Sequence, residues 1–417
     1  MNGRKEKKMT DGELNMTAEN EKKRKSSGGR KKKTLCFKGT PVFISGGFSI
    51  PFMIAVFALL TIGLIMMFSA SYVTAKYRYG DSMYLIKHQL IFAVAGVVLM
   101  FFFSRINPEI YKKLTVPVFG LCLLLLLLVL IFPYQPEGMS DAFKRWIMIP
   151  GINFSFQPSD VGKLGIIMFF AWAMDKYKRV IETKWWAALV LFGVTAALCI
   201  LIYLEKHLSC TILVFLICIM MMYLGGVDNR WFALGLSIGI PIVVFAIVFR
   251  DKIFDQYQVA RIDSFFVKDY EDVDGRWQTN QSLFALGSGG FFGLGLGNSK
   301  QKYLYMSEPQ NDFIFAIVGE ELGFVRCVLI LLLFALLIFF GFSIADKSRS
   351  LYNRLLVLGI MLHIGLQTIL NILVVTDMMP NTGISLPFFS YGGTALVMQL
   401  VEMGMVLSVS RTVSEKA

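Results

Sequence analysis

The chain has 417 residues, of which 55% are hydrophobic and only 17% are charged, and its net charge is +12. Apolar runs such as 121–132 and 328–340 lack the polar stripe that a surface helix of a water-soluble protein shows every 3.6 residues. This composition excludes a water-soluble globular protein. It predicts a protein that crosses a membrane many times, because each span needs about 20 apolar residues.

The first 38 residues are polar and strongly basic. They contain thirteen Lys or Arg and five Asp or Glu, and so supply +8 of the net charge. A block of like charge without interleaved aromatic residues is typical of a solvated tail rather than of a nucleic-acid-binding domain. Beside a membrane, such a tail attracts anionic lipid. We therefore expect a disordered basic cytoplasmic tail over residues 1–40 and no nucleic-acid partner.

Ten apolar segments follow the tail. All ten are expected to be helices, because backbone groups in lipid must find their hydrogen bonds within their own segment. Together they predict an all-α, polytopic transmembrane domain over residues 41–411, followed by a short cytoplasmic end at 412–417. The predicted helices cover residues 50–72, 85–104, 114–132, 161–175, 186–204, 209–225, 231–249, 313–343, 351–376 and 386–409.

Basic residues predict the orientation of these helices. The connections after the second, fourth and eighth helices are dense in Lys and Arg. The positive-inside rule places these connections and both termini in the cytoplasm. The longer segments 133–160 and 250–312 then lie outside, so the protein is expected to be a multi-pass protein of the cell membrane.

Segment 250–312, between the seventh and eighth helices, is too polar to face lipid and too long for a simple connection. Its aromatic residues, among them Trp277 and Tyr303, indicate an ordered outer cap. Its glycines between 287 and 297 allow two interpretations. They form tight turns and close packing, or they place backbone amides near an anionic ligand.

Carboxylates interrupt the apolar pattern where this outer segment ends. Asp312 opens the eighth helix, and Glu320 and Glu321 lie inside it. An ionisable group in a span costs at least about 2.5–3.5 kcal/mol on insertion scales, so it indicates a functional site by default. Asp312, at the outer end of the span, is the principal candidate.

A second group of charged residues lies in segment 133–160 and at the start of the fourth helix. Lys144, Arg145 and Lys163 are candidates for phosphate binding, because Arg offers a planar fork and Lys a point charge. The alternative is that these side chains reach lipid headgroups. Asp160 belongs to the same site, or it only caps the helix that follows.

The last predicted helix is preceded by a broken segment. Pro380, Gly383, Pro387 and Gly392 interrupt an otherwise apolar sequence. Irregular backbone at membrane depth is tolerated where it lines a cavity or is buried in protein. Polar residues in and near this segment favour a cavity wall over a simple kink: Asn371, Thr382, Ser385 and Ser390.

These motifs resemble those of the SEDS family (shape, elongation, division and sporulation), which are membrane glycosyltransferases of bacterial cell-wall synthesis. The resemblance extends from about residue 45 to 410, and Asp81-Ser82 is more similar to the division and spore-cortex branch. The run 204–210 departs from the family's pattern. The resemblance is carried by Lys144-Arg145-Trp146, Gln157-Pro158-Ser159-Asp160 with Lys163, Gln281-Ser282-Leu283, Asn311-Asp312-Phe313 with Glu320-Glu321, and the segment 380–393.

The resemblance implies a reaction. Family members polymerise lipid II, a disaccharide-pentapeptide on undecaprenyl pyrophosphate, with inversion at the anomeric carbon. Asp312 matches the family's essential carboxylate and would be the base. Lys144, Arg145, Lys163 and Arg261 are candidates for stabilising the pyrophosphate. The other implied substrate-binding residues are Trp146, Gln157, Ser159, Asp160, Gln281, Glu320, Glu321, Asn371, Pro380, Thr382, Gly383 and Ser390.

No organic cofactor is expected, but a divalent cation, magnesium or manganese, could neutralise the pyrophosphate. The sequence contains no dedicated metal site, because its three histidines are far apart and its six cysteines include no C-x-x-C pair. The resemblance implies three kinds of partner: lipid II and undecaprenyl pyrophosphate lipids, the bacterial cytoplasmic membrane, and a class B penicillin-binding transpeptidase.

Two other functions fit some of the same features. A lipid II flippase or other transporter also has ionisable groups in a cavity between helices, and would carry acidic residues deep within several of them. A non-catalytic scaffold for the transpeptidase would carry an altered Asp312 motif. Here the acidic residues gather at the outer face, apart from Glu320 and Glu321, and the motif is intact. The polymerase is therefore the favoured function.

Overall fold

The computed structural model describes residues 36–37, 40–44, 46–134, 145–149, 154–253, 256–266, 275–306 and 308–414. The chain divides into two compact units, residues 1–43 and residues 44–417. In the first unit, strands β1 (Cys36–Phe37) and β2 (Thr40–Pro41) pair antiparallel. The predicted basic tail, up to residue 35, lies outside the described residues.

The second unit is a bundle of helices, which confirms the all-α, polytopic fold. Its one described sheet is the antiparallel pair β3 (Ile147–Ile149) and β4 (Phe154–Phe156). The helices are α2 (Ile50–Tyr79), α3 (Tyr84–Arg105), α4 (Pro108–Ile131), α5 (Pro158–Lys176), α6 (Lys178–Thr183), α7 (Trp185–Leu204), α8 (Leu208–Leu224), α9 (Asn229–Val248), α10 (Arg250–Ile253), α11 (Gln256–Phe266), α12 (Gly275–Gly289), α13 (Ile314–Lys347), α14 (Leu351–Val375) and α15 (Gly393–Ser414).

Each of the ten predicted helices has a counterpart in this series. In the described part of the chain, seven are long and apolar enough to cross a membrane: α2, α3, α4, α7, α13, α14 and α15. Helix α8 is also apolar but has only 17 residues. The structure therefore supports a multi-pass protein, and the count of ten spans stays a prediction.

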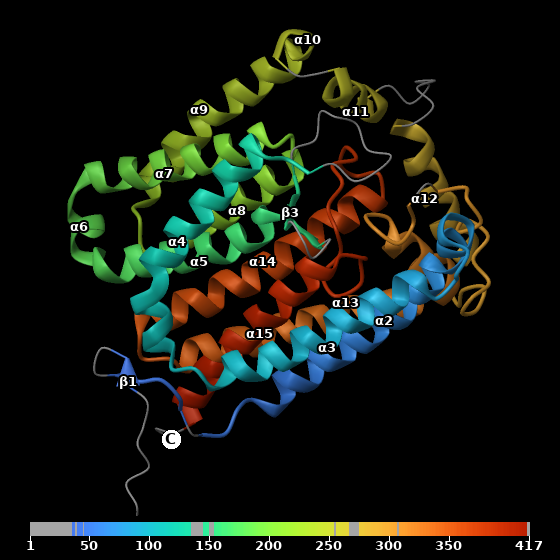
Figure 1. The fold of residues 1–417 in the computed structure, drawn as a ribbon. Helices are drawn as coiled ribbons and strands as arrows, with labels where there is room; N and C mark the ends of the chain where they lie inside the picture. Colours follow the sequence, from blue (N-terminus) through green and yellow to red (C-terminus); the bar gives the residue numbers. More distant parts are fainter. Residues whose placement is uncertain are drawn as a thin grey trace, which may run out of the picture. The chain divides into compact units, whose positions relative to one another are not determined.

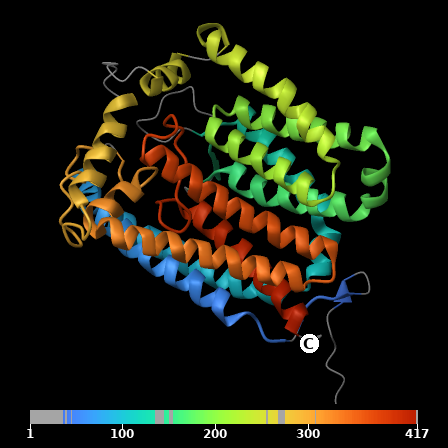
Figure 2. The same ribbon diagram turned by 180° about the vertical axis from the view of Figure 1, so that it is seen from behind.

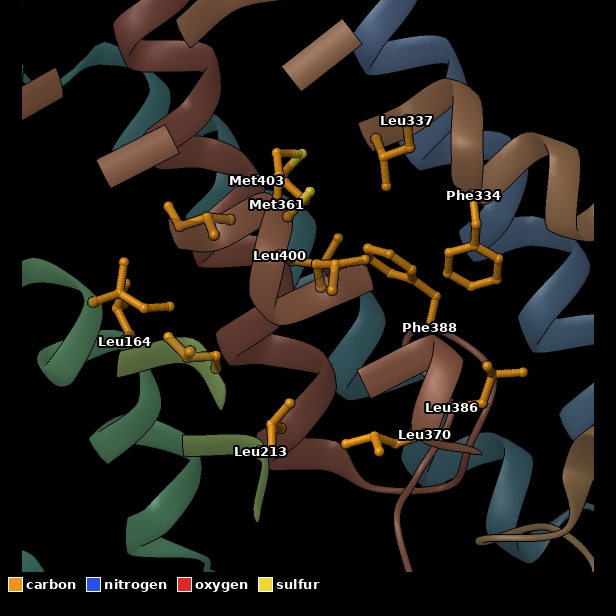
Figure 3. Packing of buried hydrophobic residues seen from close by; sticks show 14 of the residues in the cluster. Leu164, Leu213, Phe334, Leu337, Met361, Leu370, Leu386, Phe388, Leu400 and Met403 are labelled. Atoms are coloured by element: carbon orange, nitrogen blue, oxygen red, sulfur yellow. The ribbon is translucent and has the colours of Figure 1, made fainter. Parts of the chain in front are cut away.

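Helices α14 and α15 are the most buried of the candidate spans and lie at the centre of the bundle, and α13 packs beside α14 (Figures 1 and 2). Helices α2 and α3 pack against α13 and α15 on one side, and α5 and α8 pack against α14 on the other. Figure 3 shows Leu164 and Leu213 approaching this centre from α5 and α8, with Phe334 on α13 across from them. Most of the buried side chains in this core are apolar, so the polar groups buried among them need protein partners.

The start of the last helix was predicted wrongly. Helix α15 begins at Gly393, not at residue 386, and the preceding residues form an irregular loop. The backbone of Phe388 has a positive φ of 64°, which a helix cannot contain. Its amide donates to the Gln399 side chain at 3.0 Å, and its ring packs near Phe334 (Figure 3). Side-chain contacts thus replace the helical hydrogen bonds here.

The outer segment contains helices α10, α11 and α12, and its glycines pack closely. A Cβ on Gly289 would lie 2.1 Å from the carbonyl oxygen of Gly319 on α13. Gly323 breaks α13 with φ 79° and ψ 173°, and the amide of Leu294 donates to the carbonyl of Glu320 at 2.9 Å. The structure therefore supports turns and close packing for these glycines.

Candidate active site

A pocket of about 250 Å³ lies where several broken segments meet. It is enclosed by the start of α5, the turn between α7 and α8, the turn before α13, the middle of α14 and the loop before α15. The predicted site residues that line it are Arg145, Trp146, Gln157, Asp160, Lys163, Asp312 and Gly383. Residues more than 160 positions apart in the sequence thus share one cavity. Lys144 lies outside the described residues.

Asp312 lies in the turn that precedes α13. Its peptide carbonyl accepts a hydrogen bond from Asn371 Nδ2 at 2.7 Å, and the same nitrogen donates to the carbonyl of Ile384, also at 2.7 Å. Ser390 Oγ donates to the carbonyl of Asn311 at 2.7 Å. These contacts join the Asp312 turn to the loop before α15, so Asn371 and Ser390 support the pocket from behind its lining.

The surroundings of Asp312 change its acidity. Burial raises the pKa of its carboxyl above the ordinary value of 3.8, while the nearby charges of Arg261 and Arg145 act in the opposite direction. A carboxylate with a raised pKa is a stronger base once ionised. The two guanidinium groups favour the ionised form that a base requires.

Gly383 allows the loop to approach this carboxylate. Its φ is +69°, and a Cβ there would lie 3.0 Å from Asp312 Oδ2 and 3.8 Å from Arg261 Nη1. Arg261, on α11, also donates to the carbonyl of Asn381 at 3.0 Å. The outer cap therefore brings one cation to the same side of the pocket as Asp312.

The start of α5 supplies a buried ion pair. Lys163 Nζ lies 3.0 Å from Asp160 Oδ1, one turn apart on the helix, and both side chains are 9% exposed. Gln157 is the N-cap residue of this helix, so Asp160 is not the cap. Its carboxylate instead fixes the Lys163 ammonium in the pocket wall.

The turn between α7 and α8 also lines the pocket, although the sequence of 204–210 departs from the family's pattern. His207, Ser209 and Cys210 face the cavity. Gln157 Nε2 lies 3.0 Å from His207 Nδ1, and Arg145 Nη2 donates to the carbonyl of Lys206. This turn thus orients two of the predicted site residues.

Two ionisable groups in this turn have shifted pKa values. Burial raises the pKa of Glu205 to about 8, against the opposing charge of Arg145. Burial, together with the charges of Arg145 and Lys163, lowers the pKa of His207 well below its ordinary value. At neutral pH the imidazole is therefore uncharged and can accept a hydrogen bond on one nitrogen.

Glu320 and Glu321 are not part of this pocket. Glu321 accepts hydrogen bonds from Ser69 Oγ at 2.7 Å and from Lys302 Nζ at 2.9 Å, and Glu320 accepts from Ser299 Oγ. Both carboxylates are completely buried. They hold the turn around 299–302 against α13 and α2, and their position does not support the predicted contact with substrate.

Other predicted residues lie outside the lining of the pocket. Ser159 is buried and accepts a hydrogen bond from Gln157 at 2.8 Å, and Gln281 is buried on α12. Pro380 and Thr382 belong to the loop before α15, but only neighbouring positions of that loop reach the cavity.

Several lining residues were not predicted from the sequence, among them Gln367 and Thr394. Gln367 donates to the carbonyl of Ser385 at 2.9 Å, which secures the same loop. A glutamine within an apolar helix was a signal that could have indicated a polar cavity.

Comparison with known proteins identifies the class to which this fold and pocket belong. The chain has the fold of multi-pass SEDS proteins: it superposes on RodA of Thermus thermophilus with a TM-score of 0.63 and 25% identity, covering 88% of this chain and 97% of that one. A chain in a structure of a peptidoglycan synthase complex matches with a TM-score of 0.71 at 23% identity, covering 88% of this chain and 98% of that one.

The sequence relatives define the family. Residues 51–415 match the family described as cell cycle protein, FtsW/RodA/SpoVE. Stage V sporulation protein E of Bacillus subtilis (strain 168) is 38% identical over 359 residues, which cover 85% of this chain and 94% of that protein. The probable peptidoglycan glycosyltransferase FtsW of Trichlorobacter lovleyi is 34% identical, covering 86% and 92%. The chain belongs to the FtsW/RodA/SpoVE family, which confirms the SEDS resemblance.

Proposed function

We propose that this protein is a peptidoglycan glycosyltransferase that polymerises lipid II and releases undecaprenyl pyrophosphate. The observation that carries this proposal is the pocket that holds Asp312 together with Arg145 and Lys163. A single inverting displacement needs a base for the attacking hydroxyl and cations for the departing pyrophosphate. The relatives that are named peptidoglycan glycosyltransferases support the same activity.

Asp312 is the base in this reaction. Its carboxylate takes the proton of the acceptor sugar's 4-hydroxyl as that oxygen forms the bond to the donor's anomeric carbon. The bond from this carbon to the pyrophosphate oxygen breaks on the opposite face, so the configuration inverts. Because burial raises the pKa of Asp312, the carboxylate accepts the proton more readily than an exposed aspartate would.

The negative charge that develops on the leaving pyrophosphate is met by Arg145, Lys163 and Arg261. The other two carboxylates of the lining are already paired: Asp160 with Lys163 at 3.0 Å and Glu308 with Arg78 at 2.8 Å. Arg145 lines the pocket directly. The planar fork of its guanidinium group suits a bidentate contact with phosphate oxygens.

A divalent cation, such as magnesium or manganese, would have to share its ligands with the substrate. In the described part of the chain, no three His, Cys, Asp or Glu side chains gather as a metal site. The residues present therefore do not form a complete metal site. In the proposed reaction the base and the cations are supplied by the side chains of the pocket.

The pocket faces the outer side of the bacterial membrane in this proposal, with both termini in the cytoplasm. The Lys- and Arg-rich connections α3–α4, α5–α7 and α13–α14 lie at the opposite ends of the helices, as the positive-inside rule requires. A class B penicillin-binding transpeptidase is the proposed partner, because a similar fold occurs in a peptidoglycan synthase complex.

A lipid II transporter is the second candidate, and one contact favours it. His363 on α14 lies 3.0 Å from Glu402 on α15, and both side chains are buried within the apolar core. Ionisable pairs at this depth occur in proton-coupled transporters. The pair was not predicted from the sequence.

Purified protein and labelled lipid II distinguish these functions. We expect glycan strands to form in the presence of moenomycin, which blocks the other class of polymerase. Movement of lipid II across the bilayer of reconstituted liposomes, without glycan strands, would instead establish the transporter. The absence of both activities from folded protein would favour the scaffold.

A further inference from the structure

A second pocket, of about 560 Å³, lies at the far ends of the helices from the candidate active site. Helix α14 reaches both, because Gln367 lines the first pocket and Asn353 lines the second. At 1.5 Å per residue, the two side chains are about 21 Å apart along the helix axis. The second pocket is therefore separate from the active site and has no part in the proposed reaction.

The lining of this pocket is positively charged. Lys347 ends α13, Arg349 lies in the short connection to α14, and Glu109 is the only carboxylate among the described residues of the lining. With two cations and one anion, the lining has a formal charge of +1. A positive lining of this kind attracts an anion.

Helix α14 begins at the same pocket. The first amides of a helix have no acceptor within the helix, and they attract anions. Ser350 is the N-cap residue, but its side chain makes no capping hydrogen bond. By contrast, α4 also starts here and is capped, because the Asn107 side chain accepts from the amide of Glu109 at 3.0 Å. The open helix end is therefore that of α14.

A buried side chain provides an independent indication of a ligand. Asn353 is only 6% exposed, and within the described chain its Oδ1 has no hydrogen-bond partner. A buried acceptor without a donor is costly, so a native protein seldom retains one unless something binds there. Asn353 Oδ1 can therefore accept a hydrogen bond from a ligand in the pocket.

We propose that this pocket binds the phosphodiester of a membrane-lipid headgroup. Helices α13 and α14 are both apolar enough to cross a membrane, so their short connection lies at the membrane surface, where headgroups are abundant. Lys347, Arg349 and the first amides of α14 bind the phosphate oxygens, and a hydroxyl of the headgroup donates a hydrogen bond to Asn353 Oδ1. The ligand holds the α13–α14 connection to the start of α4, on the membrane face opposite the active site.

The test is a binding titration with delipidated protein in detergent, followed by native mass spectrometry. The probes are dihexanoyl-phosphatidylglycerol and inorganic phosphate. We expect one phosphatidylglycerol per protein, with inorganic phosphate binding at least tenfold more weakly. The double substitution Lys347→Ala and Arg349→Ala should weaken phosphatidylglycerol binding about tenfold or more, because each removed side chain is a charged donor.

Arg354→Ala is the matched control. Arg354 lies on the same helix and carries the same charge, but it is 53% exposed, faces Asp346 and does not line the pocket. Asn353→Ala should weaken binding about two- to tenfold. If that variant fails to fold, the exposed Lys347 and Arg349 positions still provide the test.

Two results would overturn the proposal. One is equal affinity for phosphatidylglycerol in the double variant and in Arg354→Ala. The other is equal affinity of the native protein for inorganic phosphate and for the lipid, which would make the site a receptor for a free phosphate.

Discussion

Replacing Asp312 with asparagine separates the chemistry of the pocket from its folding. The substitution keeps the size and shape of the side chain, and the supporting hydrogen bond from Asn371 goes to the peptide carbonyl, which is unchanged. Only the proton acceptor is lost. Removal of a general base lowers a rate about 10²- to 10⁴-fold, which corresponds to about 2.7–5.5 kcal/mol of barrier.

Asp312→Asn should lower the rate of polymerisation, but it should not lower the stability of the folded protein. The pKa of Asp312 is raised in the folded protein, so the folded state prefers the protonated carboxyl. Protein stability therefore falls as the pH rises from about 4 through the raised pKa, because the unfolded chain ionises first. At neutral pH the native carboxylate is the less favourable state. Asp312→Asn should then melt at the same temperature as the native protein, or higher.

The assay measures polymerisation of labelled lipid II and thermal unfolding on the same preparation. Asp81→Asn is the matched control, since Asp81 is a half-exposed aspartate paired with Lys87 at 2.8 Å and far in sequence from the pocket. In the native enzyme the rate should fall as the pH is lowered through the raised pKa of Asp312. Near-native polymerisation by Asp312→Asn would refute its role as the base. A large drop in its melting temperature would refute the reasoning on stability.

Substitutions at five further positions test the pocket and its supports. Arg145→Ala should lower the rate of lipid II polymerisation at least tenfold, and Arg145→Lys should not fully restore it. If titration with lipid II gives the same curve for both variants and the native protein, Arg145 contacts lipid headgroups instead. Asn371→Ala should destabilise the protein by about 1–3 kcal/mol in chemical unfolding, because two buried carbonyls lose their donor; an unchanged midpoint would contradict this. Gly383→Ala should lower polymerisation at least tenfold, since its Cβ would crowd Asp312 at a positive φ, and Gly80→Ala, also at positive φ but in open space, is its control. Lipid II should protect the thiol of Ser385→Cys from labelling, and equal labelling with and without lipid II would argue that this loop does not line the substrate site. Gly392→Leu should stop activity without unfolding the protein, because a Cβ there meets only Ala395 at 3.6 Å.

The helices could be predicted from the sequence because their cause is local. A run of about 20 apolar residues must satisfy its backbone within itself in lipid, whatever its neighbours are. Asp312 could also be found, because a carboxylate at the end of such a run is costly wherever the helix packs. The start of α15 could not, because the Phe388 turn is stabilised by the Gln399 side chain eleven residues further on and by packing against Phe334 on α13.

The role of a buried charge was decided only by the tertiary structure. Glu320 and Asp312 are eight residues apart and looked alike as candidates in the sequence, yet Glu320 accepts a hydrogen bond from Ser299 while Asp312 faces the pocket. The turn at 204–210 departs from the family's sequence pattern, yet the structure shows that it lines the cavity. Hydropathy reports what it costs to bury a group in the membrane. The partner that offsets this cost can come from a helix more than a hundred residues away in the chain. Only the packing of the helices determines whether a charged side chain pairs with another residue of the protein or remains available to a substrate.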